Sequence, residues 1–170
     1  PEFGSEKFRK TARDAAAESI TLLKNDGILP LKKGTRILVA GPNAIGHRPL
    51  NGGWSYSWQG EKVDEFTAEY NDILAAVRAV FGDKNVTHIP GVSYRDEIKY
   101  STEYKDRFKD AVKAAKKADC VVLCIGENYY AEKPGDLDDL YLNALQTQLA
   151  REMIAMGTPV ILVMSQGRPR

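Results

Sequence analysis

The sequence is poor in the residues that mark disulfide-stapled, metal-binding and membrane proteins. It has two cysteines and two histidines in 170 residues, and no apolar run approaches the ~20 residues that a membrane helix needs. Cys120 and Cys124 lie four residues apart in a hydrophobic run. In a strand they would be about 13 Å apart, whereas a disulfide needs Cα atoms within about 7 Å. We therefore expect two core thiols, which leave the compartment undecided.

An excess of charge of either sign is missing as well. Lys and Arg number 24 against 23 Asp and Glu, a net charge of +1, which gives no reason to expect a nucleic acid or an acidic membrane as partner. His47 and His88 have no partner at metal-ligand spacing, so we expect neither a metal nor a cofactor. With 43% hydrophobic and 28% charged residues, the composition is typical of one globular domain.

The chain has the pattern of alternating helices and strands. Helical periodicity predicts helices over 6–25, ended by Gly27, and around 73–81, 104–115 and 142–156. Hydrophobic runs predict strands over 36–41, 85–91, 119–127 and 158–167. This alternation predicts an α/β fold, a mainly parallel sheet flanked by helices on both faces in a three-layer α/β/α sandwich.

Two unusual loops follow predicted strands, at 42–67 and 127–141. Because ligands bind outside the carboxyl ends of parallel strands, these loops are the candidate site. "GPNAIG" at 41–46 lacks the glycine spacing of a dinucleotide-binding loop, and Pro42 removes an amide that would hold phosphate. We do not expect a nucleotide site there.

The first loop contains "NGGWSYSWQG" (51–60), with both tryptophans of the chain, Trp54 and Trp58. Aromatic faces bind the C–H faces of sugars, and nearby amides and hydroxyls bind the sugar hydroxyls. The residues alone leave a second interpretation open, in which both rings cap the core beneath a long loop.

The second loop begins with "GENYYAEKPGD" (126–136), which contains Glu127, Glu132 and the pair Tyr129 and Tyr130. A carboxyl group partly shielded from water beside aromatic rings has a raised pKa and can donate a proton near neutrality. The other interpretation is an acidic, solvated connector.

Four stretches together resemble the second domain of family 3 glycoside hydrolases, the α/β sandwich behind a (β/α)₈ barrel. They are "AAAESITLLKNDGILPL" (15–31), "GGWSYSWQG" (52–60), "GENYYAEKPGDLDDLYL" (126–142) and "PVILVMSQGRP" (159–169). The second and third resemble the sugar-binding and acid/base loops of the exo-β-glucanase branch. Pro-Glu-Phe-Gly-Ser at 1–5 looks like a cloning scar, so we expect the domain over 6–170, truncated at its C-terminus, with the native start outside the sequence.

The resemblance implies a retaining, exo-acting β-glucosidase or β-glucan glucohydrolase. By position, Glu132 matches the general acid/base and Trp58 the tryptophan that stacks on the sugar in the leaving-group subsite. We assign Trp54 and Tyr130 to substrate binding with them. The implied partners are a β-linked glucoside or glucan oligosaccharide and an N-terminal barrel domain that carries the aspartate nucleophile. We expect the isolated chain to be inactive and the full-length protein to be periplasmic or extracellular.

The alternative from another class is a non-catalytic carbohydrate-binding or structural module, with Trp54 and Trp58 as its platform. An aspartate nucleophile on a barrel encoded upstream would distinguish the enzyme from this module.

Overall fold

The computed structural model describes residues 2–95 and 102–170, and the chain forms two compact units, Pro1–Leu31 and Lys32–Arg170. The first unit contains helix α1 (Glu6–Ser19). The predicted helix to residue 25 was therefore too long. The chain turns extended at Ile20 (φ −70°, ψ 119°), and the side chain of Asn25 accepts hydrogen bonds from the amides of Gly27 and Leu29, both at 3.1 Å. Such local bonds from an asparagine compete with those of a helix.

The second unit is built on a sheet whose four described strands are all parallel, in the order β2-β1-β5-β6. The strands are β1 (Ile37–Ala40), β2 (Val86–His88), β5 (Cys120–Gly126) and β6 (Val160–Ser165). The helices of this unit are α2 (Arg48–Asn51), α3 (Ile73–Phe81), α4 (Phe108–Ala115) and α5 (Ala144–Ala155), with short 3₁₀ turns at Val63–Glu65, Asp83–Asn85 and Lys133–Gly135. The predicted α/β class, with a parallel sheet flanked by helices, is confirmed.

An antiparallel pair of strands, β3 (Gly91–Tyr94) and β4 (Glu103–Asp106), was missed by the sequence analysis. The predicted third helix was wrong at its start, since Tyr104 lies in β4 and α4 begins only at Phe108. Arg107, with φ 53°, separates the two elements. Tyr104 has helical spacing to Phe108, but pairing with β3 decides its conformation, because strand preference depends on neighbours that local sequence does not show.

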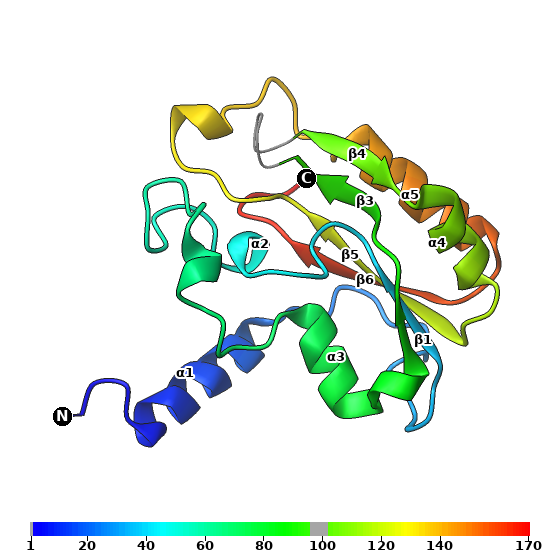
Figure 1. The fold of residues 1–170 in the computed structure, drawn as a ribbon, viewed down its shortest axis with the longest axis horizontal. Coiled ribbons are helices and arrows are strands. Elements are labelled where there is room, and N and C mark those ends of the chain that lie inside the picture. Colours follow the sequence, from blue (N-terminus) through cyan, green and yellow to red (C-terminus); the bar gives the residue numbers. More distant parts are fainter. Residues whose placement is uncertain (1, 96–101) are drawn as a thin grey trace. The chain divides into compact units, whose positions relative to one another are not determined.

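The core lies where α4 and α5 pack on the sheet (Figure 1). Its buried strand residues are Leu38, Ala40, Val121, Leu123 and Ile125, and its helix residues include Phe108, Ala111, Leu149 and Met153. The alternate residues of β5 point to the other side, where Figure 1 shows α3. They are buried too, so that β5 is buried along its whole length.

Both cysteines belong to this buried strand and are free, as predicted. Burial raises the pKa of the Cys120 thiol to about 11 and that of the Cys124 thiol to about 12. They are core residues, and the chemistry of the site must come from elsewhere.

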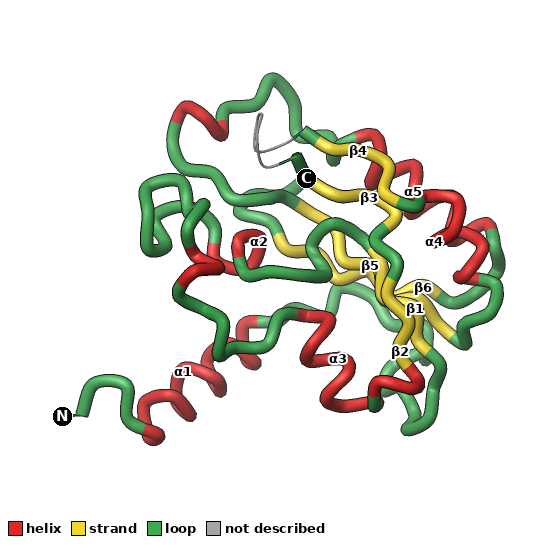
Figure 2. Tube along the Cα trace, viewed as in Figure 1, coloured by secondary structure: helices red, strands yellow, loops and turns green. Residues whose placement is uncertain are grey.

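In the sheet, β2 and β5 pair with opposite sides of β1. The chain runs from β1 to β2 first and reaches β5 later. Because β1 and β5 are parallel neighbours, the loops that follow them both start at the carboxyl ends of the strands. They leave the sheet between these two strands, where the strand order reverses. Figure 2 shows these loops together at one end of the strands. They are the two loops that the sequence indicated.

Candidate active site

The two candidate loops are joined by one side chain, Gln59. Its Nε2 donates to the carbonyl of Ala131 at 2.9 Å, and its Oε1 accepts from the amide of Ala131 at 3.0 Å. Gln59 follows Trp58, and Ala131 precedes Glu132. The structure therefore places the backbone of Trp58 and the backbone of Glu132 on either side of this pair of hydrogen bonds.

The tryptophan loop is folded tightly against the acidic loop. The amide of Trp54 donates to the carbonyl of Trp58 at 2.9 Å, and Trp54 has φ 61°. A Cβ atom on Gly53 would lie 2.2 Å from the carbonyl oxygen of Tyr130, so only glycine fits. The two indole rings stay open to solvent, Trp54 at 69% and Trp58 at 49% exposure, and neither caps the core of the described unit.

Glu132 is exposed at the turn that leads into the short 3₁₀ segment Lys133–Gly135. Its backbone has φ 53° and ψ −145°, a region that residues with a side chain rarely occupy. Its carbonyl accepts from the amide of Gly135 at 2.8 Å. Strained backbone held by surrounding contacts is a frequent property of functional positions.

Glu127, the other carboxylate of the loop, has a different environment. Its side chain is 3% exposed and accepts from Arg170 Nη1 at 2.7 Å and from Arg168 Nε at 3.0 Å. Burial by itself would raise the pKa of Glu127, but the hydrogen bonds from Arg170 and Arg168 outweigh it and hold the pKa below its usual value. Glu127 is therefore ionised and a poor proton donor near neutrality.

Tyr130 contacts both Glu127 and one of its arginines. Its hydroxyl donates to Glu127 Oε2 at 3.1 Å, and the guanidinium of Arg168 lies 4.3 Å from the centre of its ring. Arg168 also donates to the carbonyl of Gly135 at 2.6 Å. Tyr130 thus helps to stabilise the acidic loop through these contacts. Its assigned part in substrate binding stays a prediction.

Buried polar groups beneath the loop support the end of β5. Gln146 accepts from the amide of Gly126 at 2.8 Å and donates to its carbonyl at 2.9 Å. Tyr94 donates to Asn43 at 2.7 Å, and Asn43 donates to the carbonyl of Glu127 at 3.3 Å. Burial raises the pKa of the Tyr94 hydroxyl, which therefore stays protonated as a donor.

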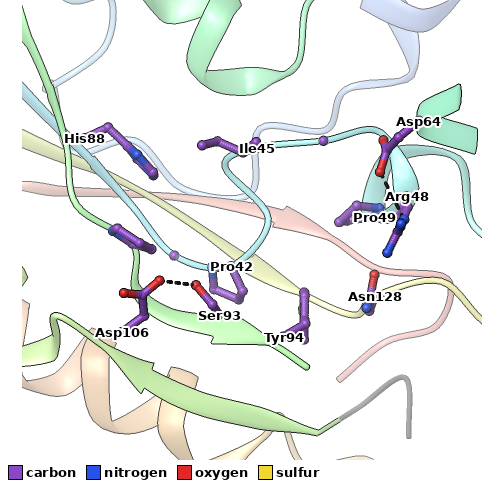
Figure 3. Close-up of a pocket in the computed structure, with 13 residues that line it drawn as sticks. Pro42, Ile45, Arg48, Pro49, Asp64, His88, Ser93, Tyr94, Asp106 and Asn128 are labelled. Carbon is purple, nitrogen blue, oxygen red and sulfur yellow. Dashed lines mark hydrogen bonds and ion pairs between the residues drawn. The ribbon is translucent and has the colours of Figure 1, made fainter. Parts of the chain in front are cut away.

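A cavity of about 370 Å³ opens beside the end of β1. On its wall Arg48 and Asp64 form an ion pair at 3.0 Å, and Ser93 donates to Asp106 at 2.8 Å. Figure 3 shows both pairs. Burial lowers the pKa of His88, which lies farther along the wall. Trp54, Trp58 and Glu132 are not among the residues that line this cavity.

Sequence reasoning found the two loops but missed Gln59, the arginines on Glu127 and the buried residue Gln146. The "WQG" stretch contains Gln59 and the closing "GRPR" contains both arginines, but their bonding partners are about 40 to 70 residues away. No local pattern would have paired them.

The family model of the glycosyl hydrolase family 3 C-terminal domain matches residues 20–170. The chain belongs to glycoside hydrolase family 3. This domain is 37% identical to a lysosomal β-glucosidase of Dictyostelium discoideum over 98% of its own length and 20% of that protein. It is 33% identical to a β-xylosidase of Formosa agariphila over 99% of its length and 23% of that protein.

The fold of this family 3 domain also resembles a solved structure of a mutant β-glucosidase from Listeria innocua in complex with laminaribiose. The two are 26% identical, with a TM-score of 0.70, over 95% of this chain and 20% of that one. The domain thus spans about a fifth of the length of the relatives it matches. Within residues 2–95 and 102–170, no helix is long and apolar enough to cross a membrane.

Proposed function

We propose that the chain is the second domain of a retaining, exo-acting β-glucosidase or β-glucan glucohydrolase. In this proposal Glu132 is the general acid/base, Trp54, Trp58 and Tyr130 belong to the sugar-binding pocket, and the aspartate nucleophile lies on an N-terminal (β/α)₈ barrel domain. The observation that carries the proposal is the pair of hydrogen bonds from Gln59 to Ala131, next to Trp58 on one loop and Glu132 on the other.

Three further observations support this assignment. Glu132 is exposed on the strained part of its loop, whereas Glu127 is buried on two arginines. Two exposed tryptophans offer faces on which a sugar ring can stack. Relatives named as a β-glucosidase and a β-xylosidase act on glycosides, and a β-glucosidase of the same fold was solved with laminaribiose.

The chemistry divides between the two domains. A retaining glycosidase needs two carboxyl groups about 5–5.5 Å apart, one as nucleophile and one as proton donor. Glu132 would protonate the glycosidic oxygen as the bond to the sugar breaks, and would then take a proton from the water that hydrolyses the glycosyl-enzyme intermediate. Placing the two groups on different domains puts the substrate at a domain interface, a common location for pockets.

The test is Glu132→Gln in the full-length enzyme. Glutamine keeps the size of the side chain but neither donates the proton nor accepts it from water, so hydrolysis of a disaccharide should fall by about 10²–10⁴-fold. An aryl glucoside with a good leaving group should still form the intermediate and give a burst of released phenol. Azide, which needs no base, should then accelerate turnover.

Glu127→Gln is the matched control, five residues away on the same loop. It should weaken the support of the loop and lower the rates for both substrates, without a burst and without rescue by azide. If instead Glu127→Gln gives the burst and the rescue while Glu132→Gln resembles the wild type, the assignment is wrong. If neither variant changes activity, the non-catalytic module is the better explanation.

A further inference from the structure

Gln59 binds Ala131 as a neighbouring strand would. The side-chain amide of Gln59 donates to the carbonyl and accepts from the amide of the same residue, at 2.9 and 3.0 Å. A flipped side-chain amide would set donor against donor and acceptor against acceptor, so the bonding pattern fixes its orientation. Ala131 is itself 5% exposed. This contact is therefore defined in both position and direction.

The Ala131 carbonyl belongs to the peptide group that joins Ala131 to Glu132. Gln59 thus holds the peptide group that enters Glu132, while the bond from the Gly135 amide to the Glu132 carbonyl, at 2.8 Å, holds the one that leaves it. The backbone of Glu132 between them is in a conformation that residues with a side chain rarely adopt. Such a conformation persists only where its surroundings hold it.

The same side chain is anchored beside the sugar-stacking residue. Gln59 directly follows Trp58, whose carbonyl accepts from the Trp54 amide at 2.9 Å. The backbones of the two loops also approach each other closely at Gly53 and Tyr130. A Cβ atom on Gly53 would lie 2.2 Å from the Tyr130 carbonyl oxygen, which leaves no space for a side chain. Gln59 therefore joins two segments that are already in close contact.

From this geometry we infer that Gln59 is a positioning residue, which sets the carboxyl group of Glu132 relative to a sugar stacked on Trp58. The inference rests on the proposed function, since it assumes that Glu132 is the general acid/base. Without the two hydrogen bonds the Ala131–Glu132 peptide group is free to turn, and the acid loses its alignment with the glycosidic oxygen. A misplacement of about 1 Å can lower the rate about 100-fold.

The test is Gln59→Leu in the full-length enzyme, which keeps the bulk and removes both hydrogen bonds. Two substrates are compared: laminaribiose, whose leaving group is another sugar and needs a proton, and a dinitrophenyl β-glucoside, whose leaving group does not. We expect kcat/KM to fall about 100-fold for laminaribiose and by less than about threefold for the dinitrophenyl glucoside. A residue that only stabilises the fold would affect both substrates alike.

Gln148→Leu is the matched control, because it removes a side-chain hydrogen bond, from Gln148 to Glu152 at 2.7 Å, that lies within α5. It should leave both substrates unchanged. Gln59→Glu covers the case in which the leucine variant does not fold, since a carboxylate still accepts from the Ala131 amide but does not donate to its carbonyl. It should give the same dependence on the leaving group, because its second oxygen faces the Ala131 carbonyl oxygen and cannot hold it.

Equal losses for the two substrates, or no loss for either, overturn the inference. Glu132→Gln is measured in parallel to separate this outcome from a failure of the proposed function. If Glu132→Gln depends on the leaving group and both Gln59 variants do not, only the positioning role is wrong. If Glu132→Gln shows no such dependence, the assignment of the acid/base fails first.

Discussion

At the scale of single residues, the two carboxylates of the acidic loop differ in what surrounds them. Glu127 accepts hydrogen bonds from two arginines and a tyrosine and is ionised in the fold, whereas the side chain of Glu132 is exposed. Two arginines beside one carboxylate stabilise the charged form, which is the reverse of what a proton donor needs. Glu127 thus has the properties of a support, which favours the proposed assignment of the acid role to Glu132.

The lowered pKa of Glu127 predicts how stability depends on pH. A carboxyl group with a lower pKa in the folded state stabilises the fold above its unfolded pKa, about 4.3, and this contribution is lost as the pH falls through the folded value. Glu127→Gln should therefore lower the free energy of unfolding at pH 7, by about 3 kcal/mol because it breaks a buried ion pair, and by less at pH 3. Urea unfolding between these pH values measures both.

Asp119, whose pKa Arg36 lowers to about 2, is a carboxylate outside the loop that is still mostly ionised in the folded state at pH 3. Asp119→Asn is therefore the control for acid effects unrelated to the loop. A Glu127→Gln variant that is destabilised equally at pH 7 and pH 3 would contradict the prediction.

At the scale of elements, the end of β1 depends on the absence of a side chain. Gly41 has φ 94°, and a Cβ there would lie 2.0 Å from the carbonyl oxygen of Cys124 in β5. Gly41→Ala should force β1 and β5 apart and lower the free energy of unfolding by more than about 3 kcal/mol. Gly34→Ala is matched to it, with φ 84° but open space around the position, and should cost only about 1 kcal/mol. Similar losses in thermal or urea unfolding would mean that backbone strain, not the close approach, is what matters.

The elements also show what the sequence could predict. The apolar strands β1, β5 and β6 and the helices α3 and α5 were predicted because their own periodicity is strong. The hairpin of β3 and β4 was missed because β4 is polar, reading Glu-Tyr-Lys-Asp, and is recognisable only beside its partner. The predicted end of α1 was wrong because the side chain of Asn25 accepts hydrogen bonds from the backbone of the following loop.

The candidate site, like the fold, was predicted in part. Strand ends and the family resemblance indicated the loops of Trp58 and Glu132, but not how they are held together. The contact between Gln59 and Ala131 joins residues 72 positions apart, and Glu127 reaches Arg170 across 43. Such contacts depend on the finished sheet and leave no local pattern.

At the scale of the whole molecule, the proposed function has the domain supply one of two catalytic carboxyl groups and part of the sugar pocket. We therefore expect the isolated 170-residue chain to release no phenol from an aryl β-glucoside, because the glycosyl-enzyme intermediate needs a nucleophile as well as an acid. Spectrophotometry with the full-length enzyme as positive control measures this. Turnover by the isolated chain that disappears in its Glu132→Gln variant would contradict the prediction.

The strand order has a consequence for how the chain folds as it leaves the ribosome. β5 pairs on one side with β1, where Arg36 and Asp119 meet across 83 residues, and on the other side with β6, which is made later. Contacts between distant segments form slowly, because closing the long loop costs entropy before the contact stabilises it. Until β6 is made, β5 has an unpaired apolar edge that other nascent chains can join. The strand that is buried along its whole length in the folded domain thus has an open edge, prone to aggregation, while the protein is synthesised.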